Sequence, residues 1–296
     1  RRRTTVLMPL TPAPNATKSS ALSDEGATGH WYERLTDGTT VPLYEEGGVF
    51  GIRRARALTK EGRCALPSAT TLFKCLHKGY LDDVWKPQQI AKEVARLSEK
   101  LTPNELQGII ADRDAFAKLK GDAFTEVDAT ATYGTAVHKA LEEWFRDGTV
   151  DREHHHIVKA VEKEFQEHGL EPIELEACVS NPELGYAGMC DVLARDADDK
   201  PCVIDFKTRK TKPGKTPGKY ESDRMQIAAY GVAHFGGNVF LEVGRGFNII
   251  ISTTEPGRVV TVEHKQKDLV RFFEAFRGLC HHWQYIKNYY PNQLTK

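Results

Sequence analysis

Acidic and basic residues occupy two neighbouring predicted strands of this chain. Asp191 lies in a strand expected over Tyr186–Arg195, and a polar turn leads to a mostly apolar strand over Cys202–Phe206, where Asp205 and Lys207 lie at the end. Side chains alternate along a strand, so Asp205 and Lys207 point to the same side. Two carboxylates can hold Mg²⁺, and an ammonium beside them can activate water or stabilise charge on a phosphate. Taken alone, Asp-Phe-Lys is a weak signal, and a buried strand whose solvent edge is charged explains it better.

Three further elements must position these residues. Residues 134–145 form an amphipathic helix on which His138 and Glu142, four residues apart, share a face. Residues 173–179 alternate as a strand, with Glu174 and Glu176 expected on one face. For His138, the alternative to a functional role is a partly buried helix histidine.

A helix over Arg224–Phe235 follows the two charged strands. Gln226 and Tyr230 lie four residues apart on it and therefore share one face. Gly236 and Gly237 end this helix. Beyond it we expect a buried strand over residues 247–252, a partner strand over 258–264, and a final helix over 267–286.

The segment between Lys207 and this helix, residues 208–219, is basic and interrupted by Pro and Gly. It fits a solvated loop and a flexible arm over a phosphate backbone equally well. The residues that would contact DNA are Arg209, Lys210, Lys212, Lys215, Lys219 and Arg224.

The chain divides into three predicted parts. Residues 1–65 form an arm, rich in Thr, Pro and Ser, and then a small β-element with strand-like pieces from Trp31 to Leu58. Residues 66–130 form a helical subdomain with helices over 87–100 and 103–119, and Ser68 or Thr70 can cap its first helix. Residues 131–296 form an α/β core with a mixed sheet, flanking helices and the C-terminal helix.

Composition sets limits on the class of protein. The 296 residues carry 41 Lys and Arg against 41 Asp and Glu, so any electrostatic attraction must come from local patches. No apolar run approaches the roughly 20 residues of a membrane span. The apolar segment near the start of the sequence is too short for a secretory signal. The six cysteines contain no Cys-x-x-Cys pair. We therefore expect reduced thiols in a cytoplasmic protein, not secreted and with no membrane partner.

The order of these elements resembles the PD-(D/E)XK nuclease superfamily and, within it, the RecB-like exonuclease branch. Four motifs over residues 131–252 carry the resemblance: Gly134-Thr-Ala-Val-His138, Gly185-Tyr-Ala-Gly-Met-Cys-Asp191, Ile204-Asp205-Phe-Lys207-Thr208 and Gln226-Ile-Ala-Ala-Tyr230. The Pro67-Ser-Ala-Thr-Thr segment is also similar to phage exonucleases and the mitochondrial genome maintenance exonuclease. The resemblance implies a restriction-endonuclease-like core with an N-terminal helical extension, in the host cytoplasm if the protein is phage-encoded.

The resemblance also implies roles for single residues. His138, Asp191, Asp205 and the Phe206 carbonyl would bind Mg²⁺ or Mn²⁺, with Glu142 and Glu176 as second-tier candidates. Lys207 would orient or deprotonate the attacking water. Gln226 would position Lys207 or DNA, and Tyr230 would support it near the phosphate.

Two features of related nucleases are missing from the sequence. Some relatives hold an iron–sulfur cluster through three cysteines after the Gln-x-x-x-Tyr helix, whereas only Cys280 follows it here, so we expect no such cluster. The phosphate-binding loop of a helicase motor, Gly-x-x-x-x-Gly-Lys-Ser/Thr, does not occur in the sequence. A nuclease with this sequence would act alone or with recombination or replication partners.

The first hypothesis is a metal-dependent DNA exonuclease that hydrolyses phosphodiester bonds at DNA ends, in recombination, repair or replication. One alternative is a site-specific endonuclease of the same fold. The other is a catalytically inactive DNA-binding protein, whose signature would be missing catalytic positions.

Overall fold

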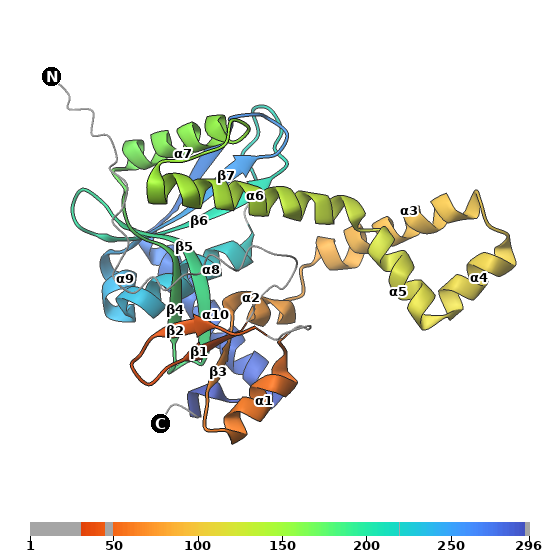
Figure 1. Cartoon of the computed structure of the whole chain (residues 1–296), viewed down its shortest axis with the longest axis horizontal. Coiled ribbons are helices and arrows are strands. Elements are labelled where there is room, and N and C mark those ends of the chain that lie inside the picture. The colour runs from red at the N-terminus through yellow and green to blue at the C-terminus, as the bar shows by residue number, and fades with distance from the viewer. Residues whose placement is uncertain (1–30, 45–49, 219, 294–296) are drawn as a thin grey trace. The chain divides into compact units, whose positions relative to one another are not determined.

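The computed structural model describes residues 31–44, 50–218 and 220–293, without the side chains of residues 126–131 and 292. The predicted arm over residues 1–30 and Lys219 lie outside the described residues. The chain is of mixed α/β class, as predicted (Figure 1). Its contacts divide it into two compact units, one of residues 1–75 and 137–296 and the other of residues 76–136.

The first unit is built on a five-stranded sheet in the order β4-β5-β6-β7-β8. Its strands are β4 (Glu171–Asn181), β5 (Tyr186–Arg195), β6 (Pro201–Arg209), β7 (Arg245–Ser252) and β8 (Val259–His264). Of these neighbours, β6 and β7 pair in parallel and the others are antiparallel. A parallel pair needs a crossover connection, which is made here by α8 (Glu221–Phe235) and α9 (Gly237–Val243). The predicted strand pattern of the core is thereby confirmed.

Helices cover both faces of this sheet (Figure 1). On one face, Phe165 of α7 (His155–His168) packs near Phe206 of β6, and α6 (Thr125–Asp147) lies beside α7. On the other face, α8 packs against β4 to β7, with α10 (Gln266–Lys287) packed on α8. The side chain of Ile227 on α8 lies against Gly246 of β7 so closely that a Cβ at Gly246 would collide with it.

A small N-terminal sheet joins the same unit, in the order β2-β1-β3. Its elements are β1 (Trp31–Arg34), β2 (Thr40–Pro42), α1 (Ile52–Lys60), β3 (Ala65–Pro67), α2 (Ala69–Leu72) and a short turn of helix, Phe73–Cys75. Arg34 and Thr40 both hydrogen-bond the Ser180 hydroxyl of β4. The small sheet is therefore attached to the large one, in contrast to the predicted boundary at residue 65.

One of the strand-like pieces in this region is a helix. In α1 the arginines at 53 and 54 are exposed, while Ala55 and Leu58, three residues apart, are buried. This period is helical, and the strand prediction missed it because the segment is short. Ser68 caps α2 by accepting a hydrogen bond from the Thr71 backbone N–H, as predicted.

The second unit is helical, and its boundaries are 76–136 where 66–130 was predicted. It contains a π-helical turn (Leu81–Trp85), α3 (Lys86–Ser98), α4 (Pro103–Ala111), α5 (Arg113–Asp122) and the start of α6. Residues 103–119 were predicted as one helix. Asp112 ends α4 in an extended conformation and caps α5 through its side chain, which divides the segment in two. Thr102 and Glu105 form a reciprocal capping box at the start of α4.

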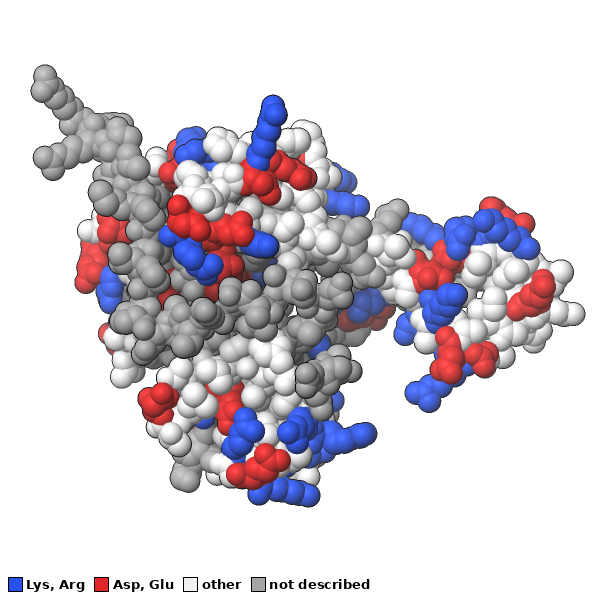
Figure 2. Space-filling view, viewed as in Figure 1, with Lys and Arg blue, Asp and Glu red and all other residues white. Residues whose placement is uncertain are grey.

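Charged residues of both signs are intermixed on the face shown in Figure 2, in keeping with the net charge of zero. All six cysteines are free thiols. Among the described residues, no helix has both the length and the apolar character that crossing a bilayer requires.

Candidate functional site

Strands β5 and β6 separate at the point where the predicted acidic residues lie. The two strands pair only from Arg195–Pro201 to Val192–Ile204, although both continue further. Asp191 and Asp205 are the next residue on each strand. Where the ladder ends, a carboxylate oxygen of Asp191 accepts a hydrogen bond from the Phe206 backbone N–H at 2.7 Å. An aspartate side chain thus takes the place of a strand partner, which opens the sheet between the two acids.

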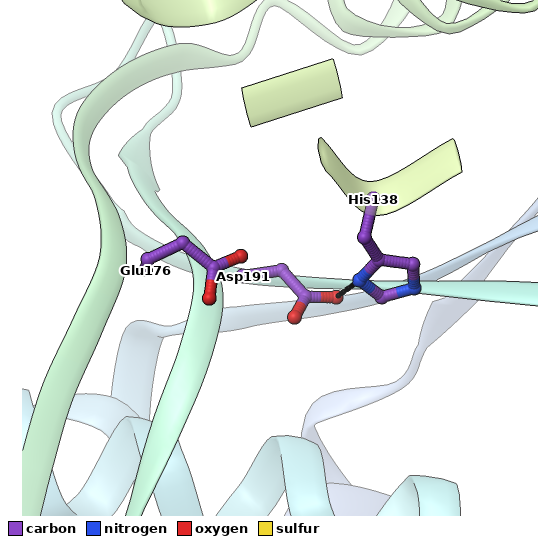
Figure 3. A group of neighbouring side chains, drawn as sticks. All are labelled: His138, Glu176 and Asp191. Carbon is purple, nitrogen blue, oxygen red and sulfur yellow. Dashed lines mark ion pairs between the residues drawn. The ribbon is translucent and has the colours of Figure 1, made fainter. Parts of the chain in front are cut away.

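His138, Glu176 and Asp191 form a compact cluster beside this opening (Figure 3). One ligand atom from each lies within 4.8 Å of the others. His138 Nδ1 is 3.6 Å from Asp191 Oδ2, and Glu176 points toward Asp191 from β4. The residues come from three elements, α6, β4 and β5, so the cluster exists only in the folded chain.

The charges in this cluster shift each other's pKa values. Burial lowers the pKa of His138, but the adjacent Asp191 carboxylate outweighs burial and raises it to about 9. Burial and then the negative charge of Asp191 raise the pKa of Glu176 to about 8. Burial opposes ionisation of Asp191, yet His138 beside it lowers the pKa of that carboxyl. Two carboxylates held this close repel each other, and a cation between them would relieve the repulsion.

The cluster fits a divalent metal ion by its donor set. Two carboxylates and an imidazole suit Mn²⁺ and, with more oxygen ligands from water, Mg²⁺. Within the described chain, no hydrogen bond or ion pair joins the Glu176 carboxylate to another residue. The Glu176 backbone has a φ of 48°, a left-handed conformation that is uncommon for a residue with a side chain. Such strain gathers at functional sites, in keeping with a ligand role for Glu176.

The structure brings three of the predicted metal ligands into the cluster and leaves two others outside it. His138 and Asp191 lie in the cluster, and Glu176, expected only in the second tier, joins them. Glu142 lies outside the cluster and pairs with Arg146 one turn later on α6, so its second-tier role as a metal ligand stays a prediction. Asp205 lies outside the cluster, and its carboxylate accepts hydrogen bonds from Lys207 and Asn248 instead.

Lys207 and Asp205 form an ion pair on the far side of the opening, in which Asp205 is buried and Lys207 is partly exposed. Lys207 Nζ donates to Asp205 Oδ1 at 2.6 Å, which confirms that the two side chains point to the same side. Burial raises the pKa of Asp205 to about 6 although the Lys207 ammonium opposes this, and the carboxylates near Lys207 raise its pKa against the effect of burial. The second oxygen of Asp205 accepts from Asn248 Nδ2 at 3.0 Å, and Asn248 Oδ1 lies 2.8 Å from His264 Nε2.

Helix α8 presents Gln226 and Tyr230 on one buried face, as the spacing predicted. Gln226 Nε2 donates to Tyr230 Oη at 3.0 Å, so the amide holds the phenol. The sequence reasoning missed Asp223, which lies one turn before Gln226, is buried, and raises the pKa of Lys207 by its charge. The signal was present, since residues at i, i+3 and i+7 of a helix share a face.

Tyr230 packs directly on Gly188 of β5. A Cβ at Gly188 would lie 2.7 Å from Tyr230 Oη and nearer still to the ring, closer than real side chains approach. We expect Gly188→Ala to displace the ring, break its bond to Gln226 and destabilise the fold by about 1–3 kcal/mol. Urea unfolding measures this loss of stability. The matched control is Gly278→Ala in α10, where a Cβ meets nothing within 4 Å and the helix gains about 0.5–1 kcal/mol. Equal midpoints for the two variants would contradict the prediction.

The predicted DNA-contacting residues divide into two sets. Arg209 pairs with Asp223 and lies over the Tyr220 ring, and Arg224 pairs with Glu221 at 2.8 Å, so both are engaged within the chain. The side chains of Lys210, Lys212 and Lys215 are exposed.

The loop that carries these lysines is tied down, in contrast to a freely flexible arm. Arg258 donates to the Lys212 and Lys215 carbonyls at 2.8 and 2.7 Å. Thr211 accepts from or donates to the Ser252 hydroxyl at 2.6 Å. The fixed backbone presents the three exposed lysines along the stretch that follows Lys207 in the sequence.

Comparison with known proteins adds little to this geometry. No family model matches the chain, and no curated protein matches it. A solved structure titled "Crystal structure of SSO0001" matches 68% of this chain and 88% of its own, at 15% identity and a TM-score of 0.25. A likeness that weak carries no argument about fold or function.

Proposed function

We propose that this chain is a metal-dependent deoxyribonuclease of the PD-(D/E)XK superfamily, in its RecB-like branch, acting as an exonuclease at DNA ends. The observation that carries the proposal is the His138–Glu176–Asp191 cluster beside Lys207 and Asp205, across the opening between β5 and β6. The order of elements supports it: a helix with His138, three antiparallel strands with the acids, then a crossover helix and a parallel strand.

In this proposal, His138, Glu176 and Asp191 would hold Mg²⁺ or Mn²⁺, and Asp205 and the Phe206 carbonyl, which lie outside that cluster, would add further oxygen ligands. Such an ion would supply charge for the scissile phosphate and lower the pKa of a bound water. Lys207, held by Asp205, would orient the attacking water or stabilise the charge that develops on the phosphate; the raised pKa keeps it an ammonium, so it does not take the proton of the water. Gln226 and Tyr230, which are hydrogen-bonded to each other on α8, would support Lys207 and the DNA phosphate.

The exposed lysines at 210, 212 and 215 are proposed to contact the DNA backbone. Phosphate contacts by lysine act without regard to sequence and weaken as salt rises. An exonuclease that removes successive nucleotides needs this kind of contact, because it must hold any sequence. Recombination, repair or replication of DNA would supply its substrates.

The decisive experiment is a time course on end-labelled linear DNA, single- and double-stranded, with Mg²⁺ and with Mn²⁺, beside a covalently closed circle. An exonuclease degrades the linear DNA and spares the circle. Cutting of the circle would replace the proposal with an endonuclease of the same fold. DNA binding without product in either metal would replace it with an inactive DNA-binding protein.

A further inference from the structure

Asn248 is the one polar side chain within the buried run of β7 from Phe247 to Ile251, and it is 4% exposed. Its neighbours in the run are Phe and Ile. A buried amide costs free energy unless both its donor and its acceptor are satisfied. In this chain both the donor and the acceptor of the Asn248 amide have a partner, and the two partners lie on opposite sides of Asn248.

The amide of Asn248 links two titratable residues on neighbouring strands. Asp205 and Asn248 are register partners across the parallel β6–β7 pair, which brings Asn248 Nδ2 to 3.0 Å from Asp205 Oδ2. On the other side, Asn248 Oδ1 lies 2.8 Å from Nε2 of His264, the last residue of β8. Because Nδ2 donates to the carboxylate, Oδ1 accepts, and His264 must carry its proton on Nε2.

The chain of contacts continues to the proposed catalytic lysine. Asp205 accepts from Asn248 through one oxygen and from Lys207 through the other, at 2.6 Å. A carboxylate with a partner on each oxygen has a fixed plane. The orientation of Asp205, and through it the position of Lys207 Nζ, therefore depends on Asn248 and His264.

We propose that Asn248 and His264 are positioning residues, which hold Asp205 so that it can both fix Lys207 and complete the cation site. The inference rests on the proposed metal-dependent function. Neither residue belongs to the His138–Glu176–Asp191 cluster. Outer partners of this kind typically change metal affinity or activity about 10- to 100-fold when removed.

The test compares wild type, Asn248→Leu, His264→Leu and His264→Gln. Gln keeps an N–H donor that can reach Asn248 Oδ1, whereas Leu does not. We measure the Mn²⁺ dissociation constant by calorimetry, kcat and KM on linear DNA, and the thermal midpoint of the metal-free protein. We expect both Leu variants to weaken Mn²⁺ binding and lower kcat about 10- to 100-fold, with KM for DNA changed less than about threefold. The His264→Gln variant should keep most of the wild-type Mn²⁺ affinity and most of the wild-type kcat.

The outcomes separate this inference from the function on which it rests. Wild-type Mn²⁺ affinity and kcat in Asn248→Leu, with only a lower thermal midpoint, would reduce Asn248 to a structural role and overturn the inference, while the nuclease proposal stands. If wild type binds Mn²⁺ and Asn248→Leu binds it more weakly, but no variant cuts DNA, the positioning role stands and the nuclease proposal fails. A wild type that binds no Mn²⁺ would overturn both.

Discussion

Replacing Lys207 with Ala is expected to lower single-turnover cleavage of linear DNA by about 10²- to 10³-fold, the usual effect of losing one positioned donor that stabilises developing charge. Lys207 Nζ lies 2.6 Å from Asp205 Oδ1, and its side chain is 25% exposed at the opening between β5 and β6. No other lysine reaches Asp205 among the described ion pairs. The variant should still bind Mn²⁺, because the cluster of His138, Glu176 and Asp191 is intact.

Folding of the Lys207 variant needs its own control, since removing Lys207 leaves the buried Asp205 carboxylate without its charged partner, which destabilises a protein. Asp205 keeps its hydrogen bond from Asn248, and Lys207→Met retains the apolar stem, so at least the Met variant should fold. Lys163→Ala removes the same charge from an exposed pair on α7 and should cut DNA as wild type does. Wild-type cleavage by folded Lys207→Ala would exclude Lys207 from the chemistry.

Much of this site could be predicted from the sequence because its parts lie on periodic elements. The alternation of β6 placed Asp205 and Lys207 on one side, and the helical spacing of Gln226 and Tyr230 placed them on one face of α8. Both predictions rest on spacing along a single element, and both are confirmed. Such spacing does not state how far apart two elements lie, which is why Asp205 was expected among the closest metal ligands and Glu176 was not.

Residues that act across strands could not be predicted in this way. Asn248 pairs with Asp205 only because β6 and β7 run parallel in one particular register, and nothing near Asn248 in the sequence specifies that register. Its position in an apolar strand was a usable signal, since a buried amide must find partners. Arg209 shows the same limit: it was expected to contact DNA because it lies in a basic segment, and its ion pair with Asp223, on another element, could not be predicted from that segment.

Replacing Asp191 with Asn is expected to weaken Mn²⁺ binding at least about 100-fold, the upper end of what loss of an outer partner costs, and to abolish cleavage. Asp191 pairs with His138 at 3.6 Å and accepts from the Phe206 N–H at 2.7 Å. The Asn side chain keeps an oxygen for Phe206 and loses the negative charge. The strand opening should therefore survive while the cation loses a charged ligand, which calorimetry with Mn²⁺ measures directly.

Glu142→Gln is the matched control, because it makes the same carboxylate-to-amide change one helical turn from His138. Glu142 pairs with Arg146 and lies outside the cluster, so its loss should change Mn²⁺ affinity by less than about threefold, in the range of a surface pair. Glu176→Gln should resemble Asp191→Asn, because Glu176 supplies the second carboxylate of the cluster. If instead Glu142→Gln removed Mn²⁺ binding and Glu176→Gln kept it, the cation would be bound at Glu142 on α6. The His138–Glu176–Asp191 cluster would then not be the metal centre.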